Sequence, residues 1–387
     1  MQSRDHARAE PKTNKTQTQQ VYERNLKYTP ADLVEKNMSR AVLIKRIDPR
    51  KRDGNLGELE ELARSAGYEV IDRITQVRPQ PDKAYCIGKG KAKGAAELLL
   101  ASVHPDKIIV DEKLSPVQSY NLSKLFHVEV IDRFNLILEI FAQRARTKEA
   151  RLQVELANLI YEKPRARMKV TLARRGEQPG FKGLGRYQAD IYESEITGRI
   201  AKIEAELEII RKRQDQAREQ RKERGFDMVA LAGYTNAGKS TLMNALVGES
   251  VMAKDQLFTT LVPTTRRLEA GRRRVLLTDT VGFIKGLPHF MVEAFRSTLE
   301  GIYEADLILL VVDASEPPDV VLDKLVTCHD TLWGKIGPVP IITVLNKSDK
   351  IDPETLERTK AAISGLAPAR SSSRLRPGRA WTSCDRR

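Results

Sequence analysis

The sequence predicts an α/β fold in three parts: a small N-terminal α/β domain, an antiparallel helical coiled-coil hairpin, and a C-terminal domain with a mostly parallel sheet. Short apolar runs alternate with helical patterns at both ends of the chain. Between them, two long stretches repeat apolar residues at spacings of three and four. A length of 387 residues also fits several domains better than one core.

The first part combines a polar arm with an alternating pattern. Residues 1–37 have no apolar period, and we expect a flexible arm there. Within residues 38–132, strands are expected at 41–44, 68–74, 108–110 and 128–131, and helices at 56–66, 91–103 and 116–126. This alternation favours a mostly parallel sheet, because parallel strands need crossover connections.

The middle part, residues 133–225, has two amphipathic patterns. One helical pattern runs from Leu136 to Met168, and a second begins near Ala189. Two such helices joined by a loop predict a coiled-coil hairpin. The joining loop, 174–186, has four glycines and four basic residues, which suits a mobile tip that enters a phosphate-lined cavity. An unstructured loop with incidental charge fits this composition equally well.

The net charge of +14 is concentrated in two stretches. Residues 133–188 hold thirteen Lys or Arg against five Glu, and residues 366–387 hold six Arg against one Asp. Such stretches indicate a polyanionic partner bound through its phosphates, because only 5% of residues are aromatic and base stacking is disfavoured. A solvated surface helix with surplus basic residues is the alternative for the first stretch.

Other features exclude whole classes of protein. Three cysteines without CxxC spacing and five scattered histidines argue against a disulfide framework and a structural zinc site. The longest apolar run, residues 307–312, is far shorter than the ~20 residues that span a bilayer. The N-terminus has no apolar core typical of a signal peptide. We therefore expect no membrane span and a cytoplasmic location.

The chemistry is indicated by a glycine-rich loop between a strand at 228–232 and a helix at 241–246. The loop has the form GxxxxGK[ST], in which backbone N–H groups cradle a polyphosphate. Lys239 would reach the β and γ phosphates, and Ser240 would bind Mg²⁺. The expected nucleotide-binding residues of this loop are Gly233, Tyr234, Thr235, Asn236, Ala237, Gly238, Lys239, Ser240 and Thr241.

Two later motifs complete a nucleotide site. A strand at 274–279 ends in Asp279, which can hold Mg²⁺ through water, and the N–H of Gly282 can reach a γ phosphate. A strand at 340–345 leads into Asn346-Lys-Ser-Asp349. The Asp349 carboxylate can accept hydrogen bonds from N1 and N2 of guanine and finds no such pair on adenine, while Lys347 can lie along the base. The motifs predict GTP and GDP binding with Mg²⁺, and they disfavour an ATPase or helicase.

The catalytic set predicted from sequence is Lys239, Thr260, Gly282 and Asn236. In the loop 255–265, either Thr259 or Thr260 could bind Mg²⁺, and only the loop's position between the phosphate motifs supports this. Phe283 follows Gly282 where Ras-like enzymes place a water-orienting Gln, so intrinsic hydrolysis should be slow. We hypothesise that Asn236 holds a potassium ion beside the phosphates, where it would supply positive charge.

Several strings of the sequence resemble the HflX family of GTPases, a translation-factor-related class. The resemblance extends from about residue 40 to about residue 365. Besides the phosphate loop, it rests on Ile87-Gly-Lys-Gly90, Asp111-Glu-Lys-Leu-Ser-Pro116, Val130-Ile-Asp-Arg133, Asp255-Gln-Leu-Phe-Thr-Thr-Leu261, Asp279-Thr-Val-Gly-Phe-Ile-Lys-Gly-Leu-Pro-His289 and Ala294-Phe-Arg-Ser-Thr-Leu-Glu300.

The resemblance implies a GTPase that binds the large ribosomal subunit and, with GTP, splits or rescues stalled ribosomes. The N-terminal domain and the hairpin would contact ribosomal RNA, and the ribosome would stimulate hydrolysis. By the family pattern, Thr260 rather than Thr259 is the Mg²⁺ ligand. We expect a monomer. The alternative is an RNA-binding or ribosome-binding module that works without GTP because its nucleotide domain is impaired.

The C-terminus departs from the pattern of a GTPase domain, here residues 226–366. A sixth strand and a Ser-Ala-Lys-like motif should follow, but residues 367–387 form a basic tail in which we expect neither. One codon choice for this tail, read two nucleotides out of phase, gives a Val-rich stretch and Ser-Ser-Ala. We therefore hypothesise a truncated or frameshifted reading near Pro368.

Overall fold

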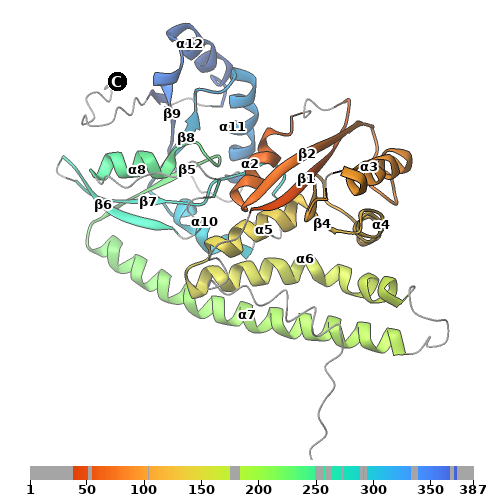
Figure 1. Cartoon of the computed structure of the whole chain (residues 1–387). Helices are drawn as coiled ribbons and strands as arrows, with labels where there is room; N and C mark the ends of the chain where they lie inside the picture. The colour runs from red at the N-terminus through yellow and green to blue at the C-terminus, as the bar shows by residue number, and fades with distance from the viewer. Residues whose placement is uncertain are drawn as a thin grey trace, which may run out of the picture. The chain divides into compact units, whose positions relative to one another are not determined.

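The computed structural model confirms the α/β class, with two sheets and a helical hairpin (Figure 1). It describes residues 38–50, 55–102, 104–174, 184–248, 257–258, 261, 263–271, 273–287, 291, 294–332, 339–366 and 370–372. The predicted N-terminal arm, most of the hairpin loop, Thr259, Thr260 and most of the basic tail lie outside the described residues.

The N-terminal domain is a four-stranded sheet with the order β2-β1-β3-β4. Its elements are β1 (Ser39–Ile47), α2 (Gly57–Ser65), β2 (Tyr68–Val77), α3 (Lys89–Ser102), β3 (Lys107–Val110), α4 (Pro116–Phe126) and β4 (Glu129–Asp132). β3 pairs in parallel with β1 and with β4. Leu43 and Ile44 of β1 are both fully buried, in two different hydrophobic clusters. Both faces of the sheet are thus covered, which explains the continuous apolar run.

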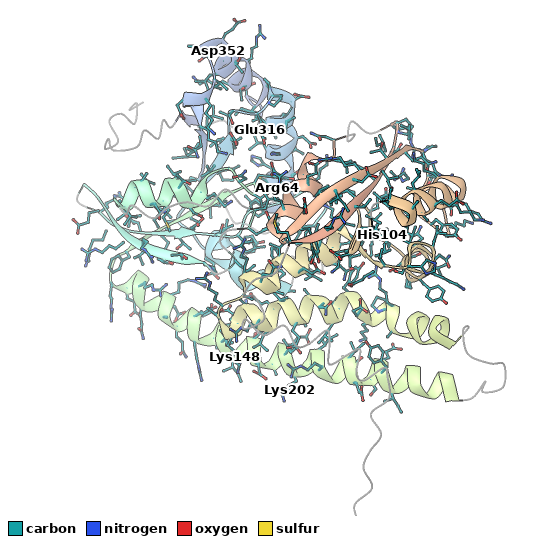
Figure 2. The ribbon with its side chains drawn as sticks, viewed as in Figure 1. Arg64, His104, Lys148, Lys202, Glu316 and Asp352 are labelled. Carbon is teal, nitrogen blue, oxygen red and sulfur yellow. The ribbon has the colours of Figure 1, made fainter. Side chains whose placement is uncertain are left out.

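The hairpin consists of α6 (Lys148–Arg174) and α7 (Leu184–Glu223), which lie side by side in Figure 1. Arg199 of α7 donates to Glu155 of α6 at 2.6 Å. Lys148, labelled in Figure 2, pairs with Glu206 across the hairpin at 2.8 Å. The contacting residue numbers rise along α6 while those of their partners fall along α7. The two helices are therefore antiparallel, as the sequence predicts.

The expectation of one helical pattern from Leu136 to Met168 is wrong. α5 (Arg133–Arg144) ends at Ala145, whose backbone is extended with ψ 91°. A new helix, α6, then begins, and the Thr147 hydroxyl caps it by accepting from the Ala150 N–H at 3.1 Å. A threonine at a helix start competes with the helical backbone for hydrogen bonds and so favours this break.

The C-terminal domain is a six-stranded sheet with the order β10-β9-β8-β5-β7-β6. Its elements are β5 (Asp227–Gly233), α8 (Lys239–Val247), β6 (Thr264–Ala270), β7 (Arg273–Asp279), α10 (Arg296–Tyr303), β8 (Leu307–Asp313), α11 (Pro318–Leu332), β9 (Ile341–Asn346), η2 (Ser348–Lys350), α12 (Pro353–Ala362) and β10 (Arg370–Ser372). Among the described strands of this sheet only the β6–β7 pair is antiparallel. The carboxyl ends of β5, β7, β8 and β9 therefore share one edge, where α/β sheets bind ligands.

The expectation that no strand follows residue 366 is also wrong. β10 pairs in parallel with β9, with Arg370 opposite Thr343 and Ser372 opposite Leu345. Main-chain hydrogen bonds along an open sheet edge do not depend on apolar side chains, so a Ser-rich segment can add a strand there. The sequence pattern has no apolar signal for it.

One hydrophobic cluster continues from the N-terminal domain through the hairpin into the C-terminal domain. Phe141 of α5 belongs to this cluster and meets Phe258 and Phe295 edge-on, each with ring centroids 4.7 Å apart. Edge-on aromatic pairs of this kind add to the stabilisation from burial. In the part of the chain that the structure describes, no helix has the length and apolarity to cross a bilayer.

Candidate nucleotide-binding site

The phosphate loop connects β5 to α8 and depends on two glycines. Gly233 has φ 146°, and a Cβ there would lie 2.2 Å from the Val311 carbonyl oxygen. Gly238 has φ 88°, and its Cβ would lie 2.3 Å from Nδ2 of Asn346. A side chain would therefore collide with the backbone at Gly233 and with the Asn346 side chain at Gly238, and both positive φ angles favour glycine. The loop ends directly at the N-terminus of α8, where free N–H groups favour a bound anion.

Lys239 is folded into the inner side of this loop. Its Nζ donates to the carbonyl oxygens of Gly233 at 3.2 Å and Tyr234 at 3.0 Å. Burial lowers the pKa of Lys239, and the negative charge of Asp279 opposes that shift. A lysine held in this way presents a poorly solvated cation to any phosphate that the loop takes up.

Two predicted magnesium ligands meet at the ends of α8 and β7. The Ser240 hydroxyl donates to Oδ2 of Asp279 at 2.6 Å, and Asp279 is 1% exposed. A hydroxyl beside a buried carboxylate is a donor set that suits a hard cation such as Mg²⁺. The third predicted ligand, Thr260, lies outside the described residues.

Gly282 faces the phosphate loop at close range. A Cβ on Gly282 would lie 2.8 Å from the Thr235 Cα and 3.0 Å from the Lys239 Nζ. The next residue, Phe283, pairs with the loop as a short parallel bridge: its N–H donates to the Gly233 carbonyl at 3.0 Å, and its carbonyl accepts from the Thr235 N–H at 2.8 Å. Predicted residues from two motifs are thus brought together.

The predicted base-binding motif is attached to the same loop. Asn346 donates from Nδ2 to the Ala237 carbonyl at 2.9 Å, and the Lys347 Nζ donates to the Asn236 carbonyl at 2.9 Å. Asn236 itself is exposed and has φ 62°. Asp349 lies in η2 and is exposed, so its carboxylate is accessible to a base. The structure therefore brings together residues of all three motifs, whereas Asp349 makes no hydrogen bond or ion pair with the described residues of the loop and Thr260 lies outside the described residues.

Sequence reasoning missed Asp313, at the carboxyl end of β8. Its Oδ2 accepts from the Lys347 Nζ at 2.6 Å. Burial raises the pKa of Asp313, but hydrogen bonds from Lys347 and Ser315 outweigh burial and hold that pKa below its usual value. The ionised carboxylate fixes the lysine that is expected along the base. An acidic residue ending a buried strand on this edge was the available signal.

Sequence reasoning also missed the surroundings of Tyr234. The Tyr234 hydroxyl donates to Oε1 of Glu58 in α2 at 2.7 Å and accepts from the Lys285 N–H at 2.8 Å. Burial first, and then the charge of Glu58, raises the pKa of Tyr234 above its usual range. Arg133 pairs with Glu58 at 3.0 Å and donates to the Lys285 carbonyl at 3.5 Å. No sequence pattern connects residues so far apart.

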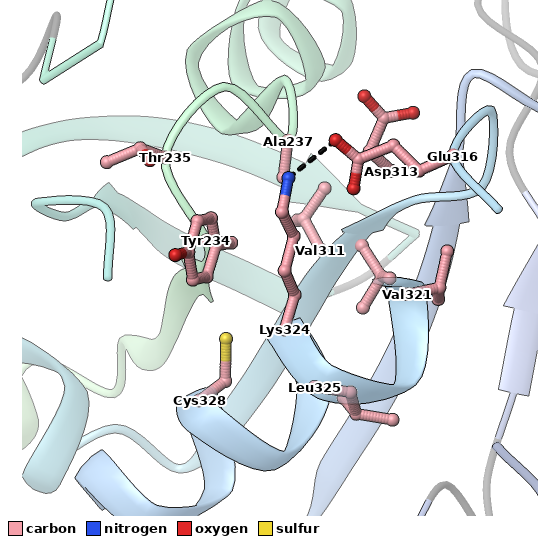
Figure 3. A pocket seen from close by; sticks show the side chains of 11 residues that line it. Tyr234, Thr235, Ala237, Val311, Asp313, Glu316, Val321, Lys324, Leu325 and Cys328 are labelled. Carbon is pink, nitrogen blue, oxygen red and sulfur yellow. Dashed lines mark hydrogen bonds and ion pairs between the residues drawn. The ribbon is translucent and has the colours of Figure 1, made fainter. Parts of the chain in front are cut away.

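A cavity lies behind the phosphate loop, between α11 and β8 (Figure 3). Tyr234 and Cys328 line it, and across it the Lys324 Nζ donates to Glu316 at 2.5 Å. Its volume of about 10 Å³ suits a single water rather than a nucleotide. Burial raises the pKa of Cys328 to about 12, so this thiol stays protonated and unreactive.

Three family descriptions match successive segments of the chain. "GTP-binding GTPase N-terminal" matches residues 53–142, "GTP-binding GTPase Middle Region" matches 144–221, and "50S ribosome-binding GTPase" matches 228–347. Together they cover β2, β3 and β4 of the N-terminal domain, nearly all of the hairpin, the phosphate motifs and the first two residues of the base motif.

Curated relatives agree with these matches. "GTPase HflX" of Thermococcus kodakarensis is 48% identical over 86% of this chain and 74% of its own length. "GTPase HflX" of Escherichia coli is 41% identical over 77% of this chain and 70% of its own length. Among solved structures, the complex of SsGBP with GDP has a TM-score of 0.50 and 27% identity, covering 87% of this chain and 93% of that one.

Proposed function

The chain belongs to the HflX family of GTPases, and from this premise we propose that it binds the large ribosomal subunit in its GTP state and splits or rescues stalled ribosomes. GTP hydrolysis is the activity of the family. The large subunit is proposed as the partner because the family description matched by residues 228–347 names the 50S subunit. A ribosomal partner implies a cytoplasmic location, and we propose that the chain acts as a monomer.

The observation that carries this proposal is the position of Tyr234. It belongs to the phosphate loop, yet its hydroxyl binds Glu58 of the N-terminal domain and the backbone of Lys285, three residues after Gly282. A γ phosphate that binds Gly282 would therefore act on a segment held by the N-terminal domain. This contact supports coupling between the nucleotide state and the surface that we propose for RNA.

The phosphate site fits a magnesium ion. Ser240 and Thr260 would bind it directly and Asp279 through water, and it would neutralise charge on the β and γ phosphates. Lys239 would contact the same phosphates, while the N–H of Gly282 would hold the γ phosphate. Asn236, an exposed residue of the loop, would hold the potassium ion. Equal turnover in sodium and potassium buffers would argue against that ion.

Sedimentation of ribosomal subunits with the full chain tests the proposal. We expect cosedimentation with the large subunit in a non-hydrolysable GTP analogue, weaker binding in GDP, and loss of this difference in Lys239→Ala. Lys360→Ala in α12, which removes a lysine from an ion pair with Glu357, is the matched control and should behave like the wild type.

Two results would contradict the proposal. Ribosome binding that is equal in every nucleotide state and unchanged in Lys239→Ala would favour the alternative, a ribosome-binding module that works without GTP. The short β10, in place of a longer sixth strand, is the observation that favours this alternative. Absence of binding to the large subunit in every nucleotide state would remove the ribosomal partner altogether.

A further inference from the structure

The hydroxyl of Thr235 is a buried polar group with no bonding partner. Thr235 is 4% exposed, and its Oγ1 makes no hydrogen bond to any residue that the structure describes. Native proteins leave few buried polar side-chain atoms unsatisfied, because such an atom loses its bonds to water without replacement. Thr235 also lines the water-sized cavity behind the loop, so the missing partner of its hydroxyl is either a water in that cavity or a ligand bound in the loop.

The position of Thr235 identifies the part of the ligand involved. A Cβ placed on Gly282 would lie 2.9 Å from the Thr235 Cγ2 and 3.0 Å from the Lys239 Nζ. The threonine methyl group, the lysine ammonium and the Gly282 backbone thus approach one point, and the Thr235 hydroxyl is carried by the same Cβ as that methyl group. In the proposed function, Lys239 and Gly282 both contact the γ phosphate. The Thr235 side chain therefore lies at the γ-phosphate end of the loop.

Phe283, the residue after Gly282, has no side-chain group that could bind the terminal phosphate. Phe283 is 5% exposed, belongs to the large hydrophobic cluster, and has its N–H and carbonyl both bonded to the phosphate loop. Its ring has no hydrogen-bonding atom, and the two backbone bonds fix its place. The side chain after Gly282 therefore offers nothing to the terminal phosphate.

We propose that the Thr235 hydroxyl donates a hydrogen bond to the terminal phosphoryl group of GTP, an inference that rests on the proposed function. In hydrolysis, water adds to the γ phosphorus and the bond from that phosphorus to the bridging oxygen breaks, which yields GDP and phosphate. The hydroxyl keeps its own proton and stabilises the charge on the phosphoryl oxygens. A group of this kind acts on GTP and not on GDP.

The test compares Thr235→Val, which keeps the shape and removes the hydroxyl, with Thr235→Ser, which keeps the hydroxyl. Affinities for GDP and for a non-hydrolysable GTP analogue, together with single-turnover hydrolysis, are measured on the full chain. For Thr235→Val we expect unchanged GDP affinity and a loss of about 10-fold or more in analogue affinity and in hydrolysis rate. Thr235→Ser should keep a higher analogue affinity and a faster hydrolysis rate than Thr235→Val.

The matched control is Thr359→Val in α12, which removes an equally buried hydroxyl bonded to the Thr355 carbonyl. It should reduce thermal stability without changing the ratio of GTP-analogue to GDP affinity. If Thr235→Val does not fold, Thr235→Ala takes its place, because it also lacks the hydroxyl. The ratio of GTP-analogue to GDP affinity is then measured on that variant.

Two results would overturn the inference. One is an equal loss of GDP and analogue affinity in the variant that lacks the hydroxyl. The other is hydrolysis at the wild-type rate in that variant. Because wild-type GDP binding is measured alongside, failure of the proposed nucleotide site would be recognised separately: the wild type itself would then bind no guanine nucleotide.

Discussion

The base preference of the site depends on one exposed carboxylate. Asp349 would accept hydrogen bonds from two donors on guanine. In Asp349→Asn the side-chain NH₂ would face those donors, whereas xanthine offers an acceptor. We expect GTP affinity to fall about 10-fold to 100-fold, with a shift toward xanthine nucleotides. Competition between GTP and XTP for the site measures this shift in base preference.

The control for this prediction is Asp352→Asn. Asp352 caps α12 by accepting from the Thr355 N–H at 2.8 Å, and Asn caps a helix almost as well. It should therefore leave the base preference and the stability nearly unchanged. An Asp349→Asn variant that still prefers guanine would remove the base assignment.

Asp313 makes the stability of the C-terminal domain depend on pH. Its pKa is lowered in the folded protein, so its carboxylate stabilises the fold above the usual aspartate pKa of about 3.9, and this contribution is lost as the pH falls through the lowered value. We expect Asp313→Asn to cost about 1 to 2 kcal/mol at neutral pH and almost nothing in strong acid.

Urea unfolding of both proteins at a series of pH values measures this difference. The comparison cancels the other carboxylates, because the wild type and the variant share them. A stability gap that stays constant from neutral to acid pH would show that Asp313 contributes through packing and not through its charge.

At the scale of elements, strongly periodic segments were predictable and weakly marked ones were not. The helix predicted at 116–126 matches α4, and the strand predicted at 128–131 matches β4 with a shift of one residue. The break before α6 depends on the cap at Thr147, and β10 depends on pairing with β9. Neither cause appears in apolar periodicity.

The same distinction applies to the candidate site. The glycines of the phosphate loop, Ser240, Asp279 and Asn346 were predictable because each motif is local in sequence. The contact from Tyr234 to Glu58 joins residues 176 positions apart, and the contact from Asp313 to Lys347 joins residues 34 apart. Only folding brings such pairs together, so single-sequence reasoning has no signal for either contact, although the position of Asp313 at the end of a buried strand was a signal for that residue alone.

The attachment of α6 to the N-terminal domain depends on Arg165. Its guanidinium donates to the carbonyls of Leu114 at 2.6 Å and Tyr161 at 3.0 Å, and it lies 3.7 Å from the buried Asp132. We expect Arg165→Met to destabilise the chain by about 3 kcal/mol, because a buried carboxylate loses a cation. Thermal and urea unfolding measure the loss.

An exposed arginine in another helix provides the control. Arg358 of α12 has a side chain 70% exposed and pairs only with the neighbouring Glu354 among described residues. Arg358→Met should change stability by less than about 0.5 kcal/mol. Equal effects of the two substitutions would mean that Arg165 is not an anchor of the hairpin.

For the whole molecule, the Tyr234 hydroxyl connects the phosphate loop with the N-terminal domain. Tyr234→Phe removes the acceptor of the Lys285 N–H and the donor to Glu58. We expect faster hydrogen exchange at Lys285 and a several-fold smaller difference in ribosome affinity between the GTP-analogue and GDP states. Tyr85→Phe, elsewhere in the N-terminal domain, is the control. An unchanged difference would show that coupling does not pass through this contact.

The basic charge of the chain should make ribosome binding strongly dependent on salt, because each phosphate that a cation neutralises releases counterions. Not all of the basic residues of 133–188 are available for this. Arg133 and Arg165 have side chains only 11% and 10% exposed and form internal ion pairs. In the proposed complex, the RNA-binding charge would therefore come from the remaining lysines and arginines, among which we count those of the hairpin loop.

We accordingly expect ribosome affinity to fall steeply between low and physiological salt. The slope of the logarithm of affinity against the logarithm of salt concentration should be smaller than the full excess of basic residues would give. Arg175→Ala and Lys182→Ala in the loop should each reduce the slope by about one, because each substitution leaves one RNA phosphate without its cation. A slope that does not change in these variants would place the RNA-binding charge outside the loop. A wild-type affinity that does not change with salt would contradict electrostatic binding to RNA altogether, because cations that neutralise RNA phosphates always release counterions.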